Sequence, residues 1–108
     1  MQELNSILTL LDQAVSSLKA RGRMSAQADH DYRVALAKKL AELRAEGNPV
    51  THLLDIARGE KEVARLRMER DIAETMYDSC REAINAYKLK ARLIEAQIDR
   101  EWGRREVV

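Results

Sequence analysis

The side chains best suited to chemistry in this sequence are one cysteine and two histidines, Cys80, His30 and His52. A cysteine nucleophile needs a neighbouring base, and a metal site needs His or Cys ligands at short, regular spacing. The two histidines lie in different segments, and neither has a second His or Cys at such a spacing. Cys80 lies between Tyr77 and Ile84 in an apolar pattern that is typical of a small buried side chain. We therefore predict no catalytic residue, no cofactor and no metal site.

Three neighbouring residues, Asp29, His30 and Asp31, also carry groups that can bind a metal ion. Neighbouring residues on a helix point about 100° apart, so these three side chains cannot converge on one ion. The sequence also lacks a glycine-rich phosphate loop, a paired-cysteine motif and the nucleophile motif of hydrolases. We therefore predict that the protein is not an enzyme.

Basic residues gather in three clusters. The clusters are Lys19, Arg21 and Arg23; Lys88, Lys90 and Arg92; and Arg100, Arg104 and Arg105. On two antiparallel helices the first two clusters would fall at similar heights and form a belt that can hold phosphates. The formal net charge is only +1, and aromatic residues are not interleaved on that surface, so we favour a protein partner over nucleic acid.

The elements that must position these residues are long helices separated by one loop. Gly47-Asn48-Pro49 is the strong loop signal, because proline removes a backbone donor and biases the preceding residue away from helix. Before the loop, apolar residues at alternating spacings of four and three predict a helix over residues 2–46. This stripe consists of Leu4, Leu8, Leu11, Val15, Leu18, Tyr32, Leu36 and Leu43.

Polar residues interrupt the stripe in its middle, where Gly22, Ser25 and Asp29 occupy positions that the spacing assigns to apolar groups. A helix with such a gap is kinked there, packs loosely there, or faces a polar group. The sequence leaves these three alternatives open.

After the loop, the sequence predicts a short helix over residues 52–58 and a long helix over residues 60–102. Thr51 is the expected N-cap of the short helix, and Gly59 is its expected left-handed C-terminal residue. The long helix has a clear 3-4 pattern, and Gly103 is its expected end. Its stripe consists of Val63, Leu66, Ala73, Tyr77, Cys80, Ile84, Tyr87, Ala91, Ile94 and Ile98.

Arg70 is the charged residue that interrupts this second stripe. A charge at such a position sets the register between helices or pairs with a buried acid, and Asp29 in the gap of the first helix is the candidate acid. Nearby arginines and acids also alternate at four-residue spacing, with Arg67 before Asp71 and Arg70 before Glu74. Such pairs predict a solvated face with salt bridges rather than a basic patch.

Together these elements predict an all-α protein with a single domain, residues 1–108. We expect a long antiparallel helical hairpin, similar to a coiled coil, with a short helix at the bend. The composition agrees, because 34% of the 108 residues are charged and only 4% are aromatic. No apolar run approaches the roughly 18 residues needed to cross a bilayer, and the N-terminus lacks a signal-peptide pattern. The single cysteine excludes an internal disulfide, so we expect a cytoplasmic protein without a membrane partner.

The second long helix carries more apolar residues than one partner helix can cover. Beside its main stripe lie Met68, Ile72, Met76, Ala86, Leu89, Leu93 and Ala96. Long helices draw their stability from packing, so this extra stripe predicts self-association, most simply as an antiparallel dimer that forms a four-helix bundle. The predicted oligomer interface consists of Met68, Ile72, Met76, Leu89 and Leu93.

Three stretches, DYRVALAKK (residues 31–39), REAINAYK (81–88) and EAQIDREWGR (95–104), resemble small uncharacterised proteins of tailed phages and prophages of Gram-positive bacteria. The resemblance covers nearly the whole chain and implies a helical hairpin that acts inside a bacterium, with no activity or site residue to transfer. It implies a non-catalytic protein that binds a host protein stoichiometrically, such as an anti-defence inhibitor of the anti-CRISPR type. A nucleic-acid-binding accessory protein of phage recombination or replication and a structural virion component are the alternatives.

Overall fold

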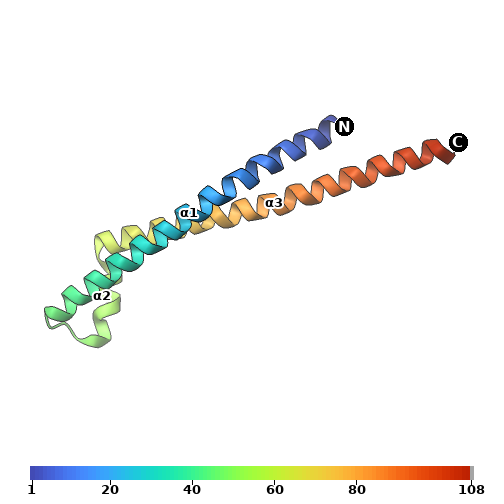
Figure 1. The fold of residues 1–108 in the computed structure, drawn as a ribbon. Coiled ribbons are helices and arrows are strands. Elements are labelled where there is room, and N and C mark those ends of the chain that lie inside the picture. The colour runs from blue at the N-terminus through green and yellow to red at the C-terminus, as the bar shows by residue number, and fades with distance from the viewer. Residues whose placement is uncertain (108) are drawn as a thin grey trace. The chain divides into compact units, whose positions relative to one another are not determined.

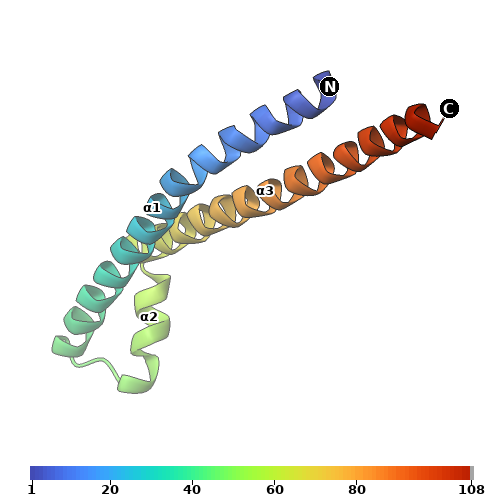
Figure 2. The same ribbon diagram turned by 45° about the vertical axis from the view of Figure 1, so that its right-hand side comes forward.

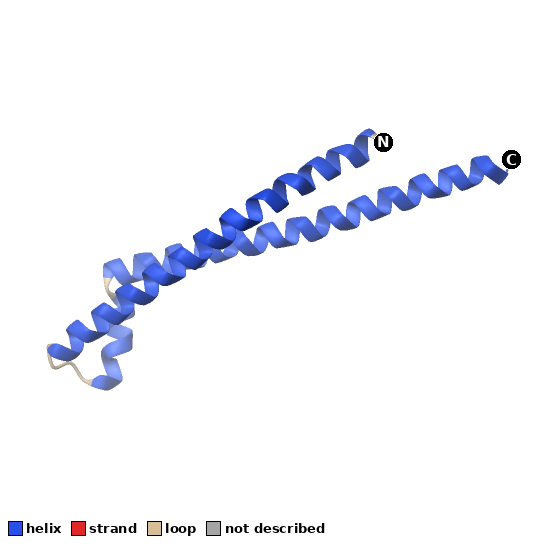
Figure 3. Cartoon of the chain, in the orientation of Figure 1, coloured by secondary structure: helices blue, strands red, loops and turns tan. Residues whose placement is uncertain are grey.

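The computed structural model describes residues 1–107, with side chains described through Arg104. Every regular element in this part of the chain is helical (Figures 1 and 3). Helix α1 spans Gln2–Ala45, a 3₁₀ turn spans Val50–His52, α2 spans Leu53–Gly59 and α3 spans Lys61–Val107. The two long helices pack antiparallel, with the short α2 at the bend. The predicted all-α helical hairpin is therefore confirmed.

The predicted end of the third helix at Gly103 is wrong, because α3 continues to Val107. Glycine ends a helix when it adopts a left-handed conformation, and among the described residues Gly47 is the glycine with a positive φ. A glycine with helical dihedral angles weakens a helix by about 1 kcal/mol without ending it. The bounds of α1 and α2 differ from the predicted bounds by a single residue.

The loop after α1 satisfies the last carbonyl groups of that helix. Gly47 has a φ of 84°, and its N–H donates to the Arg44 carbonyl at 3.1 Å. The Asn48 N–H donates to the Leu43 carbonyl at 3.2 Å, and the Asn48 side chain donates to the same oxygen at 3.0 Å. This pair of backbone bonds is a Schellman motif. The predicted break at Gly47-Asn48-Pro49 is confirmed, and Figure 2 shows α2 as a separate short helix after this loop.

The predicted caps of α2 are wrong. Thr51 lies in the 3₁₀ turn, and His52 is the N-cap residue without a capping side-chain hydrogen bond. Gly59 lacks a positive φ, and the chain instead turns at Glu60, which has extended backbone (φ −66°, ψ 137°). The Glu60 carboxylate accepts a hydrogen bond from the Val63 N–H at 3.0 Å and so caps the first turn of α3. Backbone hydrogen bonds lower the pKa of Glu60.

The chain divides into two compact units, each containing segments of both long helices. The central unit consists of Arg21–Tyr77. The terminal unit consists of Met1–Ala20 together with Asp78–Val108.

The cluster of buried residues in the central unit lies where α2 meets α1, and Tyr32 and Val63 are buried elsewhere in this unit. Leu43, Leu53 and Ala57 are buried together, and the half-buried Leu36 and Leu40 pack against them. Ala57 has no exposed surface. The short α2 therefore covers apolar side chains near the end of α1.

The terminal unit is a pair of helical segments without such a covering helix. In its described part, Ile84 and Ala91 are the buried residues. Cys80, Tyr87, Ile94 and Ile98 are half-buried, as expected for the main stripe of the second long helix.

The buried face of α1 changes phase along the helix. In the terminal unit the half-buried residues of α1 are Leu4, Ile7, Leu11, Ala14 and Leu18. Leu8 and Val15, which were predicted on the stripe, are 40% and 50% exposed, so these two assignments are wrong. In the central unit, Gly22, Ser25, Asp29, Tyr32, Leu36 and Leu43 follow the predicted spacing. The half-buried residues Ala14, Leu18 and Gly22 follow one another in two steps of four residues. A strict 4-3 alternation would use one step of four and one of three, so the buried face of α1 shifts by one position here.

Candidate protein-binding surface

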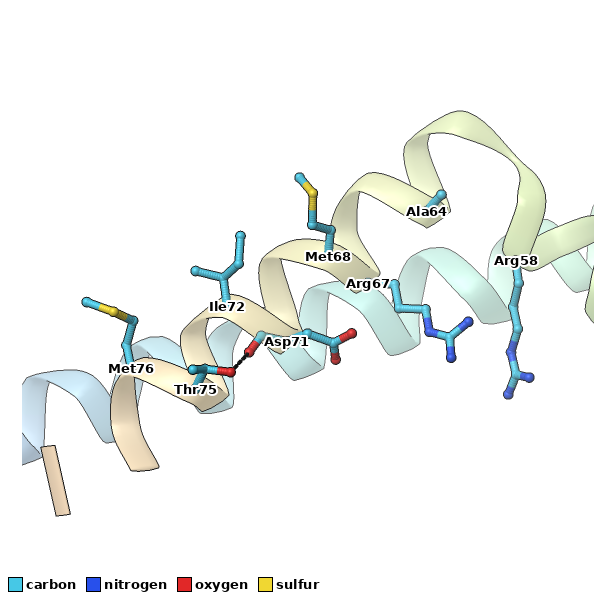
Figure 4. Close-up of a pocket in the computed structure, with 8 residues that line it drawn as sticks. All are labelled: Arg58, Ala64, Arg67, Met68, Asp71, Ile72, Thr75 and Met76. Atoms are coloured by element: carbon cyan, nitrogen blue, oxygen red, sulfur yellow. Dashed lines mark hydrogen bonds between the residues drawn. The ribbon is translucent and has the colours of Figure 1, made fainter. Parts of the chain in front are cut away.

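Three large apolar side chains of α3 form an exposed row in the central unit. Met68, Ile72 and Met76 are 56%, 54% and 42% exposed. Their four-residue spacing places them in a row along the helix, and Figure 4 shows the three side chains pointing in similar directions. These predicted interface residues are therefore uncovered within the chain.

Two open grooves border the row. One groove, of about 500 Å³, is lined by Arg58, Ala64, Arg67, Met68, Asp71, Ile72, Thr75 and Met76 (Figure 4). The other, of about 410 Å³, is lined by Arg21, Met24, Ala28, Glu69, Ile72, Ala73 and Met76. Ile72 and Met76 line both grooves and so form a ridge between them. A ridge between grooves has the shape against which another helix packs.

Met24 of α1 belongs to the same surface, although the sequence did not predict it. Its side chain is 59% exposed and lines the second groove with Met76. We call Met24, Met68, Ile72 and Met76 the methionine surface. Methionine is flexible and adapts to differently shaped apolar partners, which explains its frequent use at protein-binding surfaces. The available signal was the four-residue spacing of Met24 and Ala28 beside the main stripe of the first helix.

Arg65 forms the principal salt bridges beside the row. Its guanidinium contacts the carboxylates of Glu62 and Glu69, which lie three and four residues away on α3. These contacts raise the pKa of Arg65 and lower the pKa of Glu62. The predicted pair of Arg67 with Asp71 is absent from the described contacts, because Asp71 accepts from its neighbour in the sequence instead. The predicted salt-bridged face is present, but with different partners.

The polar gap of α1 lies within an unbroken helix. The Tyr77 ring packs on Gly22, where a Cβ atom would lie only 3.3 Å from the ring. Ser25, Asp29 and Arg70 line an open groove of about 400 Å³ beside them. Of the three alternatives for the gap, the structure supports a helix that faces polar groups.

Arg70 stacks on an aromatic ring instead of pairing with the expected acid. Its guanidinium carbon lies 4.6 Å from the centre of the Tyr32 ring, which is a cation–π geometry. Asp29 accepts a hydrogen bond from Arg33 at 2.8 Å, because four residues bring these two side chains together on α1. The predicted pair of Arg70 with Asp29 is therefore replaced by separate contacts. Hydrogen bonding to the adjacent Asp71 raises the pKa of Arg70.

Cys80 lies in the interface between α1 and α3 of the terminal unit. Its thiol donates a hydrogen bond to the Ala14 carbonyl oxygen at 3.2 Å, and the residue is half-buried. The histidines are at the surface, and His30 Nδ1 lies 3.4 Å from an oxygen of Asp31. Within the described residues, no three His, Cys, Asp or Glu side chains lie close enough to hold a metal ion.

The remaining predicted interface residues, Leu89 and Leu93, lie in the terminal unit and are 56% and 60% exposed. The exposed Lys90 and Arg92 lie between them in the sequence, and Lys90 Nζ lies 6.0 Å from the centre of the Tyr87 ring. The terminal unit thus presents an apolar pair among basic side chains.

The six residues of the predicted phosphate-binding belt fall in different units. Lys19, Lys88, Lys90 and Arg92 belong to the terminal unit, whereas Arg21 and Arg23 belong to the central unit. Arg21 is half-buried and lines the groove beside Met24. In the third basic cluster, Arg100 and Arg104 are exposed, and the side chain of Arg105 lies outside the described side chains.

Comparison of the chain with protein-family models, curated proteins and solved structures finds no match. The resemblance to phage proteins therefore stays a prediction. None of the helices in the described part of the chain combines the length and the apolar character that crossing a membrane requires.

Proposed function

We propose that this protein is a non-enzymatic binding module that acts stoichiometrically by holding another protein against its methionine surface. The observation that carries this proposal is the half-exposed Met68, Ile72 and Met76, bordered by grooves on both sides. Apolar side chains that remain together at a surface mark sites where a partner excludes water.

The form of the surface favours an amphipathic helix as the bound element. The four-residue row of α3 is a ridge of the kind that interdigitates with the corresponding ridge of a crossing helix. Glu69 and Asp71 lie on either side of the row, and their side chains are 48% and 57% exposed. Arg58 and Arg67 line the first groove and Arg21 lines the second, so charges of both signs border the row. A partner helix that carries basic residues opposite Glu69 and Asp71 complements these two carboxylates in charge.

The resemblance to phage proteins supports a bacterial host protein as the partner. In that setting the binding would inhibit the host protein, as an anti-defence inhibitor of the anti-CRISPR type does. A structural virion component is the alternative role within the same setting. Purified phage particles distinguish the two roles, because a virion component is present in many copies per particle and an inhibitor is not.

Nucleic-acid binding is a second candidate function, favoured by the exposed Lys88, Lys90 and Arg92. Contacts between these residues and phosphates would weaken steeply as salt is added. The measurement is electrophoretic retardation of single- and double-stranded oligonucleotides at low and high salt. A shift at low salt that disappears at high salt supports this candidate, and no shift at low salt excludes it.

Affinity capture from an extract of a Gram-positive host tests the proposed function. The full chain serves as bait, next to a Met24→Glu/Met76→Glu variant that places charges in the second groove. Val34→Glu is the matched control, because Val34 is 54% exposed and does not line either groove of the methionine surface. We expect one protein to be retained by the wild type and the control and lost by the double variant. Equal retention by all three baits would contradict the proposal.

A further inference from the structure

Helix α3 carries two exposed apolar faces whose neighbouring charges are opposite. The acidic face, in the central unit, consists of Met68 and Ile72 with Glu69 and Asp71 on its two sides. Within the chain these two carboxylates also contact Arg65 and Arg70. The basic face, in the terminal unit, consists of Leu89 and Leu93 with Lys90 and Arg92 on its two sides. All eight residues of the two faces are exposed. The apolar pairs are 21 residues apart, which is three heptads, so both faces use equivalent heptad positions.

We propose that a second copy of this chain covers these faces, with the acidic face of one copy packed antiparallel against the basic face of the other. The inference rests on the proposed function, because it names an occupant for part of the methionine surface. A foreign protein that binds the acidic face must match the same pattern and therefore competes with the second copy.

The charges select the antiparallel orientation. When Met68 lies opposite Leu93 of the second copy and Ile72 lies opposite Leu89, the apolar residues form two layers of a coiled-coil seam. Residues on the same side of the seam then meet, which brings Glu69 next to Lys90 of the second copy. On the other side, Asp71 comes next to Arg92 of the second copy.

In a parallel orientation, Met68 would lie opposite Leu89 of the second copy and Ile72 would lie opposite Leu93. This arrangement loses the charge pairs. Glu69 would then lie near Asn85 of the second copy, and Asp71 would lie near Gln97. Neither neighbour carries a charge, so the parallel contact is the weaker one.

Contact between like faces is disfavoured as well. Two acidic faces would bring Glu69 and Asp71 next to their own counterparts, and two basic faces would do the same with Lys90 and Arg92. Repulsion between like charges disfavours both of these pairings, so an acidic face pairs preferentially with a basic face.

The surface area of the chain is large enough for such an interface. The accessible surface is 8335 Å², whereas a compact monomer of 12.4 kDa exposes about 6,100 Å². The excess of about 2,200 Å² is larger than the roughly 800 Å² that each partner buries in an interface of standard size. Each copy carries both faces. When the acidic face of one copy packs on the basic face of the other, the remaining basic face and the remaining acidic face can pair in the same way.

Charge reversal tested by sedimentation equilibrium decides this proposal. The variants of the full chain are Glu69→Lys/Asp71→Lys, Lys90→Glu/Arg92→Glu and the combination of all four substitutions. We expect a wild-type dimer at tens of micromolar, at least about tenfold weaker association in each double variant, and association restored in the fourfold variant. Glu46→Lys/Asp55→Lys is the matched control, because both residues are exposed at the bend and carry the same change in charge.

A monomeric wild type at tens of micromolar would overturn the proposal, and so would a fourfold variant that associates as weakly as the double variants. Helical circular dichroism at the wild-type level in each variant shows that the comparison is between folded chains. Capture from host extract separates this proposal from the proposed function. If both proposals hold, the fourfold variant dimerises but no longer captures the foreign partner, because that partner matches the original charges. If only the proposed function fails, the wild type captures no foreign protein and still dimerises.

Discussion

The central unit and the terminal unit contain segments of the same two helices but enclose their side chains differently. In the central unit, α2 packs on α1, and Leu43, Leu53 and Ala57 are buried together. In the described part of the terminal unit, which has no third helix, Ile84 and Ala91 are the buried residues. Tyr32 and Val63 are also buried in the central unit. The seven residues of α2 therefore add a cluster of buried side chains that the terminal unit lacks.

The largest expected difference between the units is the cost of truncating a leucine of α1. Leu43→Ala removes a side chain from the cluster around Ala57 and should lower the free energy of unfolding by about 2–5 kcal/mol. Leu8→Ala in the terminal unit should cost about 0.5 kcal/mol, because Leu8 is 40% exposed. Urea denaturation at one fixed protein concentration measures both. Equal losses would show that the terminal unit encloses its leucines as well as the central unit does.

The second prediction concerns the glycines on either side of α2. Gly47→Ala should destabilise the protein by about 1–2 kcal/mol, because Gly47 has a φ of 84°. Gly59→Ala should be neutral or stabilising by up to about 1 kcal/mol, because its φ is not positive and a Cβ atom there meets nothing within 4 Å. Thermal unfolding of the two variants separates these outcomes. A larger loss for Gly59→Ala than for Gly47→Ala would break this account of how α2 is connected.

A smaller effect is expected at Arg70, where the stripe of the central unit carries a charge. Arg70→Lys keeps the charge but loses the planar group that stacks on Tyr32, and it should cost about 0.5–1 kcal/mol. Arg67→Lys at an exposed position of the same helix is the control and should have no measurable effect. If the two variants unfold at the same urea concentration, the stacking does not contribute to stability.

The smallest effect is the pH dependence of the cap at Glu60. Hydrogen bonds from the backbone of Val63 and Glu62 lower the pKa of Glu60 in the folded protein. The stabilisation is therefore complete above the pKa of the unfolded chain and is lost as the pH falls through the lower folded value. Glu60→Gln should lose less melting temperature than the wild type on acidification. Glu46→Gln, at an exposed position, is the control. Matching profiles of wild type and Glu60→Gln would refute the role of the cap.

Periodicity made most of the fold predictable. The stripe of α3 keeps its 3-4 alternation from Val63 to Ile98, and each of its predicted positions is buried or half-buried. The exposure of Met68, Ile72, Leu89 and Leu93 followed from the same pattern, since these residues lie off the stripe that faces α1. A long regular helix repeats its signal many times, so a single exception does not hide it.

Features that depend on one or two residues were not predictable in this way. The phase shift of α1 rests on two successive four-residue steps, from Ala14 through Leu18 to Gly22. The apolar residues at both Ile7 and Leu8 conceal it, because either residue could belong to the buried face. The choice between Gly47 and Gly59 as the left-handed residue is made by backbone hydrogen bonds at the end of α1. Which charged side chains pair with one another depends on the positions of their end atoms, so the contacts of Asp29 with Arg33 and of Asp71 with Arg70 were not predicted. The exposure of Met24 depends on packing between two helices, for which the four-residue spacing of Met24 and Ala28 is only a weak signal.

The central claim is that the exposed faces of α3 bind a helix of defined orientation. Disulfide trapping between copies tests this claim most directly. In a Cys80→Ala background, copies with Ile72→Cys are mixed with copies with Leu89→Cys and oxidised gently. The antiparallel pairing of acidic and basic faces predicts a cross-linked pair in the mixture and little cross-linking of either variant alone. Cross-linking of Ile72→Cys copies to one another, or none in the mixture, would contradict the account.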